Sequence, residues 1–169
     1  ARRHLGKWSR DGRSEIVEVS LEAFVQAYHA SKKLDWLTRK MFVHLLNIHH
    51  KHHPECLRLF GARDRQSGKI VAGLAVVEYP DIVQSFHLVS FIHDSVRKTS
   101  VGVELIAHWY TRGMENGIRF FHFGIVWRKG DPRAYKGYSK FKRQFDVHLI
   151  IYPRPLIKFI PGRSSVPSR

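Results

Sequence analysis

The chain of 169 residues holds one cysteine, Cys56, and no apolar run long enough to cross a membrane. A single cysteine excludes a disulfide within the chain and favours a reducing compartment, so we expect a cytoplasmic protein. No signal peptide is recognisable. No internal repeat is visible, which excludes an array of repeated structural units.

Signatures of several enzyme classes are missing as well. The sequence has no GxSxG elbow, no P-loop and no dinucleotide-binding glycine fingerprint, so hydrolase and nucleotide-triphosphatase chemistry has no support. The stretch from His49 to Cys56 is rich in metal-ligating residue types. However, Pro54 breaks the predicted helix ahead of the cysteine, and the spacing matches no closed zinc pattern. We therefore predict that the protein binds no metal.

Acidic residues are scarce: 14 Asp and Glu stand against 29 Lys and Arg, and the formal net charge is +15 with histidine neutral. Such an excess favours a polyanionic partner, such as nucleic acid, an anionic membrane or a phosphate-rich small molecule. The same charge can also serve solubility alone. Hydrophobic residues make up 43% of the chain, which at this length predicts one globular domain with a sizeable core.

Hydrophobic periodicity predicts the order of strands and helices. Apolar runs predict strands at 14–20, 56–64, 69–79, 85–94 and 118–126, and a last pair at 147–153 and 155–160. Helical spacing predicts helices at 21–31, about 35–53, about 101–116 and 132–145. This order predicts the α/β (α+β) class, with a central mixed, mostly antiparallel sheet and helices on both faces.

The ends of the chain differ from its middle in composition. We expect residues 1–13 to be a basic leader or linker, 14–160 to form a single domain, and 161–169 to be a disordered tail.

A basic loop, Arg97–Gly102, leads into the third predicted helix. A helix N-terminus offers free amide hydrogens and a partial positive charge, which suit a pyrophosphate. Ser100 and Gly102 are small enough for close approach to the backbone. The alternative is an ordinary helix start, with Thr99 or Ser100 as the N-cap and the loop cations solvated.

The loop resembles the Gln/Arg-x-x-Gly-x-Gly/Ala pattern of the GNAT acyltransferases, with Ser100 in place of the first glycine. The second half of the chain resembles the FemAB-like branch of that superfamily. Gly117–Gly124 matches its G-x-x-x-F-D-F-G motif except at His122, and Phe141–Asp146 matches its F-K-x-x-F-G motif except at the final residue. Together with the strand order, the resemblance favours a phosphate-binding loop.

The resemblance implies a GNAT-like domain that takes an acyl group from acyl-CoA, with acetyl-CoA as the expected donor. In this family the thioester lies in a gap between the fourth and fifth strands. The residues implied in donor binding belong to the fourth strand and the loop: Phe91, Ile92, His93, Arg97, Lys98, Ser100, Val101 and Gly102.

Attack of an amine on a thioester needs a base for the amine proton and an acid for the leaving thiolate. The candidates by residue type and place are the bases Glu78, His93 and His122 and the acids Tyr135 and Tyr138. FemAB-like proteins keep a lysine at the position of Lys142, so the resemblance implies that its cation faces the reaction centre and stabilises an oxyanion. The alternative for Lys142 is a solvated helix lysine beside Lys140 and Arg143.

The leading hypothesis is an N-acyltransferase that transfers an acyl group from acyl-CoA to the amine of a small molecule or peptide. A second is a tRNA-dependent aminoacyltransferase acting on a peptidoglycan precursor, one half of a two-domain FemAB-like protein. In that case tRNA or another polyanion would bind the basic surface. A third is a non-catalytic binding module with this fold. A second GNAT-like domain or a homodimer is a further expected partner.

Overall fold

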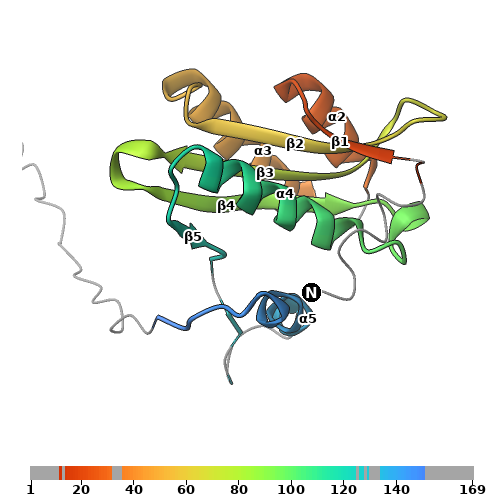
Figure 1. The fold of residues 1–169 in the computed structure, drawn as a ribbon. Helices are drawn as coiled ribbons and strands as arrows, with labels where there is room; N and C mark the ends of the chain where they lie inside the picture. The colour runs from red at the N-terminus through yellow and green to blue at the C-terminus, as the bar shows by residue number, and fades with distance from the viewer. Residues whose placement is uncertain are drawn as a thin grey trace, which may run out of the picture.

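The computed structural model describes residues 12, 14–31, 36–124, 126–127, 129 and 134–150. Its strands and α-helices follow the predicted order (Figure 1). They are β1 (Ser14–Glu18), α2 (Leu21–Ala30), α3 (Trp36–His52), β2 (Leu57–Asp64), β3 (Ile70–Tyr79), β4 (Gln84–Ile92), α4 (Val101–Glu115), β5 (Phe120–His122) and α5 (Ala134–Lys142).

The described strands form one sheet in the order β1-β2-β3-β4-β5. Strands β1 to β4 pair antiparallel, whereas β4 and β5 pair in parallel. The predicted hairpin between β2 and β3 turns at Gly68, whose φ of 69° suits glycine and whose N–H donates to the carbonyl of Asp64. The predicted class, with a mixed and mostly antiparallel sheet, is confirmed.

Helices cover both faces of the sheet, as predicted (Figure 1). On one face, Trp109 and Leu105 of α4 are buried against Phe60 of β2 and Val76 of β3. On the other face, α2 and α3 cover a second core of buried side chains: Phe24, Tyr28, Leu46, Leu57, Val77 and Phe91. Alternate residues of one strand therefore enter different cores, as the period of two requires.

Helix α3 (Trp36–His52) carries apolar residues on two sides. Leu46 is fully buried and Phe42 packs against the core, but Leu37, Met41 and Ile48 are exposed. One side of this helix therefore presents apolar side chains to the outside in the described part of the chain. None of the described helices is long and apolar enough to span a membrane.

A β-bulge interrupts β4 in its middle. Val89 pairs with Ala75 of β3, and His87 pairs with Val76, so Leu88 is the extra residue. Leu88 and Val89 both pack in the core under α2 and α3. His87 instead contacts Trp109, which belongs to α4 on the opposite face. The bulge therefore reverses the alternation of side chains and bends β4 where it occurs.

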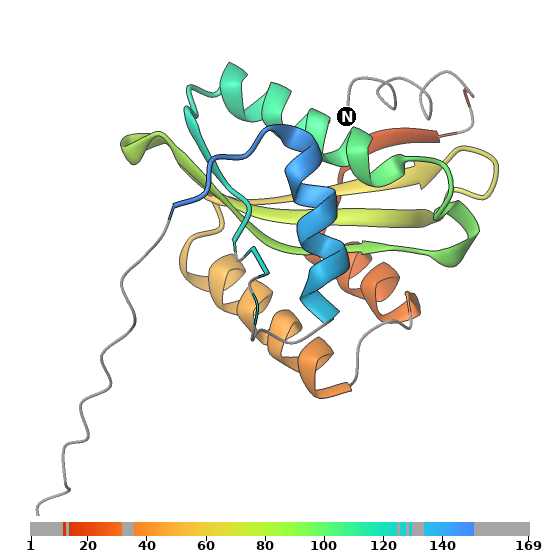
Figure 2. The same ribbon diagram turned by 90° about the horizontal axis from the view of Figure 1, so that it is seen from below.

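Strands β4 and β5 pair over three residues only, Gln84–Phe86 with Phe120–His122. Beyond this pairing, no described strand lies against the outer edge of β4. Figure 2 shows α5 in front of that edge, running from the side of α2 and α3 towards the side of α4. The two strands thus separate just before the bulge, and α5 covers the opening.

The predicted fifth strand at 118–126 was too long. The strand ends at His122, and Gly124 takes a φ of 70°, which ends extended geometry. Residues 147–150 form no strand either, contrary to the prediction. The rest of the predicted last strand pair, the tail 161–169 and residues 1–11 of the leader lie outside the described residues.

Two residues that replace motif glycines keep a glycine-like backbone. Ser100 has φ 62° and ψ 15°, and Asp146 has φ 55° and ψ 46°. Ser100 occupies the N-cap position of α4, but its side chain makes no capping hydrogen bond. The hydroxyl of Thr99 donates backwards to the carbonyl of Val96, at 2.6 Å. Neither side chain therefore caps the first turn of α4, and the N–H groups of Val103 and Glu104 donate to the carbonyl of Ser100.

Replacing Ser100 by glycine should raise the free energy of unfolding by about 0.5–1 kcal/mol. A side chain in the left-handed region costs roughly 1–2 kcal/mol, and the greater freedom of glycine in the unfolded chain offsets part of the gain. Chemical denaturation measures the change. Ser95→Gly is the matched control, since Ser95 is exposed in the preceding 3₁₀ turn without positive φ and should lose stability slightly. A destabilised Ser100→Gly protein would contradict the account of this turn.

Candidate functional site

Lys142, the last residue of α5, lies where β4 and β5 separate. It is 2% exposed, and its Nζ lies 4.0 Å from the position that a Cβ on Gly124 would take. Burial lowers the pKa of Lys142 from its ordinary value of 10.5 to about 8. The amine is therefore protonated at neutral pH but loses its proton easily.

The amphipathic character of α5 explains why this lysine points inward. Phe141 and Phe145 pack in the core under α4, with their rings 5.2 Å apart. The exposed cations Lys136, Lys140 and Arg143 follow one another at spacings of four and three residues, which places them together on one face. Lys142 lies off that face and next to the two phenylalanines, so it enters the core with them.

His87 is the functional candidate that the sequence analysis missed. Its ring lies 6.5 Å from the rings of both Trp109 and Phe123, and it is nearly parallel to Phe123 at 13°. Trp109 is itself fixed by a hydrogen bond from Nε1 to Ser85 Oγ, at 2.8 Å. Burial first, and the charge of Lys142 second, lower the pKa of His87 to about 4. His87 is therefore a neutral base beside a buried cation.

Phe141 connects the loop with Lys142. A Cβ added to Gly102 would lie 3.0 Å from Ile92 Cδ1 and 3.7 Å from Cζ of Phe141. Phe141 therefore contacts the first turn of α4, while the next residue, Lys142, reaches the end of β5. The last turn of α5 thus connects the predicted phosphate-binding loop with the point where β4 and β5 separate.

Arg97 and Lys98 of the loop are exposed, as a contact with a charged ligand requires. Arg97 lies 3.6 Å from a carboxylate oxygen of Asp94, in a solvent-exposed ion pair. Such pairs are weak, so an incoming phosphate can displace the carboxylate. Val101 begins α4, and Gly102 follows it in the first turn. The uncapped turn, the small residue and the two cations fit a pyrophosphate.

The structure does not bring the three candidate bases together. Glu78 is 2% exposed on β3, burial raises its pKa, and its charged neighbours are Arg58, Arg112 and Glu18. His93 Nε2 is 2.9 Å from the carbonyl of Ala27 in α2. Glu78 and His93 therefore interact with different groups, and Lys142 is not among the neighbours described for either.

His122 lies closest in sequence to the opening between the strands. Its ring stacks on Phe86 at 4.4 Å, with 8° between the planes. Successive residues of a strand point to opposite faces, so His122 and Phe86 lie on the face away from His87 and Phe123. His122 therefore flanks the end of the β4–β5 pairing from the side of α2 and α3.

The candidate acids belong to α5, but the side chains of Tyr135 and Tyr138 lie outside the described part of the chain. Ser139 of the same helix is buried, and its Oγ accepts a hydrogen bond from the backbone N–H of Trp127, at 2.6 Å. This bond ties the segment after β5 to α5.

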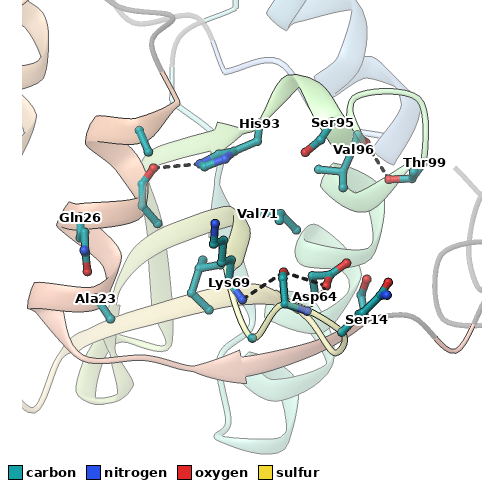
Figure 3. Close-up of a pocket in the computed structure, with 16 residues that line it drawn as sticks. Ser14, Ala23, Gln26, Asp64, Lys69, Val71, His93, Ser95, Val96 and Thr99 are labelled. Carbon is teal, nitrogen blue, oxygen red and sulfur yellow. Dashed lines mark hydrogen bonds between the residues drawn. The ribbon is translucent and has the colours of Figure 1, made fainter.

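A cavity of about 1020 Å³ lies on the other side of the loop, between α2, the β2–β3 hairpin and the start of the loop (Figure 3). His93, Ser95 and Thr99 line it, together with Lys69 and Asp64. None of its lining residues belongs to β5 or α5. Lys142 is therefore not part of this cavity.

Within the residues that the structure describes, no three His, Cys, Asp or Glu side chains gather as metal ligands would. Just after α3, His53 Nδ1 lies 3.8 Å from a carboxylate oxygen of Glu55.

Solved structures of low sequence identity share this fold. The ribosomal-protein-alanine N-acetyltransferase from Brucella melitensis biovar Abortus 2308 has a TM-score of 0.55 and 15% identity, over 86% of this chain and 99% of its own. The aminoglycoside acetyltransferase meta-AAC0020 from an uncultured soil metagenomic sample has a TM-score of 0.56 and 13% identity, over 88% and 99%. A transcriptional regulator from Bacillus halodurans C-125 has a TM-score of 0.61 and 16% identity, over 86% and 99%.

No curated protein matches the chain. A family model described as an acetyltransferase (GNAT) domain matches residues 1–143, most of the sequence. The chain therefore belongs to the GNAT acetyltransferase family.

Proposed function

We propose that the protein is an N-acyltransferase that takes its acyl group from acyl-CoA and transfers it to an amine. The observation that carries this proposal is the buried cation of Lys142 where β4 and β5 separate, joined through Phe141 to the loop at the start of α4. An acyl-transfer site needs a binding element for the donor and a charge at the reacting carbonyl. Both are present.

The donor would lie along the open edge of β4. Its pyrophosphate would bind the first turn of α4, where Ser100, Val101 and Gly102 offer backbone amides and Arg97 and Lys98 add positive charge. Its pantetheine arm would follow the outer edge of β4 from Ile92 and Phe91 towards the bulge. The thioester would then reach His87 and Lys142.

The reaction would proceed by direct attack of the acceptor amine on the thioester carbonyl. The ammonium of Lys142 would stabilise the oxyanion, because burial makes its charge act in a medium of low dielectric constant. His122 is the proposed base, since it flanks the opening from the opposite face. Tyr135 and Tyr138 are the proposed acids for the thiolate, since α5 carries them beside Lys142.

The acceptor would be a small-molecule or peptide amine. Two structural neighbours support this class, because their names describe acetylation of a ribosomal-protein alanine and of aminoglycosides. A binding module without chemistry is the weaker hypothesis. Burying an amine lowers stability, and a module would gain nothing from keeping Lys142 in the core.

A second candidate is transfer from an aminoacyl-tRNA to a peptidoglycan precursor, as in a FemAB-like protein. The segment 118–145 carries eight Lys and Arg and one Asp, and its exposed cations on α5 favour a polyanion. A second GNAT-like domain or a homodimer would belong to this alternative.

Acetyl-CoA should raise the melting temperature of the protein. At about 100 times the dissociation constant the stabilisation is about 2.7 kcal/mol, which for a chain of this size corresponds to roughly 5–10 °C. Arg97→Glu should remove most of the shift, because it places a second carboxylate beside Asp94 at the phosphate site. Arg119→Glu is the control at the far end of β5 and should leave the shift intact. An unchanged melting temperature at saturating acetyl-CoA would refute the proposal that acetyl-CoA is the donor.

Acyl transfer should decline as the pH rises through about 8, where Lys142 loses its proton. The titratable groups nearby are His87 on β4, which is already neutral, Tyr110 on α4, whose pKa burial raises to about 12, and His122 on β5. Between pH 8 and 10.5 the unfolded state binds more protons at Lys142, so this group makes the fold more stable as pH rises. A loss of rate between pH 8 and 10.5 therefore cannot be explained by unfolding that the titration of Lys142 causes.

Lys142→Met should lower kcat about a hundredfold or more, with little change in donor binding, and should abolish the alkaline decline. Lys140→Met, on the exposed face of α5, should behave as wild type. A thiol-release assay with a panel of amines measures both. An alkaline decline that persists in Lys142→Met would show that another group titrates.

A further inference from the structure

The outer side of α3 presents large apolar side chains to solvent. Four of them are between 42% and 67% exposed: Trp36, Leu37, Met41 and Ile48. Spacings of four and seven residues place Leu37, Met41 and Ile48 in one strip, on the side of the helix opposite the buried Leu46. Figure 2 shows α3, in orange, at the rim of the molecule, with α2 beside it and no described element on its outer side.

Cations lie beside this strip on the same side of the helix. Lys40 follows Leu37 by three residues and Lys51 follows Ile48 by three, so each exposed cation neighbours an apolar side chain. Nζ of Lys40 also lies 6.0 Å from the centre of the Trp36 ring. The helix contains no aspartate or glutamate, and the whole chain carries a formal net charge of +15.

We define the outer face of α3 as these six exposed residues: Trp36, Leu37, Lys40, Met41, Ile48 and Lys51. We propose that this face binds the surface of a lipid bilayer that contains anionic phospholipids. A helix that lies in the plane of the headgroups buries its apolar side chains at the start of the acyl chains and holds its cations beside the phosphates. Tryptophan prefers the same depth. The inference is independent of the proposed reaction.

The charge of the outer face distinguishes a bilayer from other partners. Nucleic acid would bind the cations through its phosphates, but that attraction is electrostatic and leaves the apolar strip in water. A second copy of the chain, joined through the same face, would bring Lys40 and Lys51 against cations of the other copy, with no acidic residue on α3 to pair with them. An anionic bilayer matches the apolar and the cationic strip at once.

The contact would be shallow and reversible. The rest of α3 is committed to the protein core, since Leu46 is fully buried and Phe42 and Val43 pack against the core under α2 and α3. The helix therefore cannot sink beyond its outer side chains. A large part of the attraction would come from charge, so salt should weaken the binding.

Binding to vesicles tests the proposal on the whole protein, without donor or acceptor. Vesicles of phosphatidylglycerol and phosphatidylcholine in equal parts should bind the protein at low salt, and pure phosphatidylcholine at least about tenfold more weakly. The double variant Leu37→Gln/Met41→Gln should reduce binding at least about tenfold, because two side chains no longer enter the acyl region. Lys40→Gln should reduce it roughly fivefold.

Two variants of α4, which covers the opposite face of the sheet, are matched controls. Met114 is 60% exposed and Met41 58%, and Arg112 is an exposed cation like Lys40. Met114→Gln and Arg112→Gln should each bind within about twofold of wild type, because α4 faces away from the bilayer. Glutamine is a good helix former, so every variant should keep the wild-type melting temperature.

Brominated acyl chains in the same anionic vesicles test the depth of the contact, since bromine quenches only a tryptophan that reaches it. Trp36 should be quenched, whereas Trp109 is fully buried in the core under α4. Trp36→Phe should still bind and should lose most of the quenching. Quenching that persists in Trp36→Phe would place a different surface against the bilayer and overturn the proposal.

The double variant decides between the remaining outcomes. Equal vesicle binding by wild type and Leu37→Gln/Met41→Gln would show attraction by charge alone and would contradict the proposal. A dimer in lipid-free solution that the double variant dissociates, measured by analytical ultracentrifugation, would identify a second copy as the partner of this face and would also contradict it. Neither result involves acyl-CoA, so the proposed function would stand in both cases.

Discussion

The arrangement depends on the early separation of β4 from β5. Parallel pairing stops at Phe86 and His122, and the bulge at Leu88 then bends β4. If the two strands paired along their whole length, the backbone N–H and C=O groups at the outer edge of β4 would all bond to β5, and no ligand could bind there. Because the strands separate, no described strand pairs with β4 beyond Phe86, the ring of His87 lies 6.5 Å from that of Phe123, and α5 lies in front of this edge.

The burial of Lys142 is the second constraint, and it opposes stability. An amine in the core must be desolvated, which lowers its pKa to about 8. Phe141 and Phe145 hold the last turn of α5 in the core and carry the lysine with them. Contact between Phe141 and Gly102 joins this turn to the start of α4. The loop at the start of α4 and the buried amine are thereby held by the same few side chains.

Much of the fold could be predicted from local pattern, because hairpins and amphipathic helices are encoded locally. The hairpin through Gly68 and the order of strands and helices are such cases. The end of β5 was missed, because Phe123 and the residues after it are β-prone and only the backbone of Gly124 reveals the turn. His87 was missed because the bulge at Leu88, a property of strand pairing, decides which face it joins. Lys142 was found through a motif, but its burial follows from tertiary packing.

The central claim is that the opening between β4 and β5 is the acyl-transfer site. A crystal structure of the protein with CoA tests this most directly. The account predicts the pyrophosphate at the first turn of α4 and the sulfur between His87 and Gly124, within reach of Lys142 Nζ. CoA bound instead in the cavity between α2 and the β2–β3 hairpin, with the β4 edge empty, would contradict it.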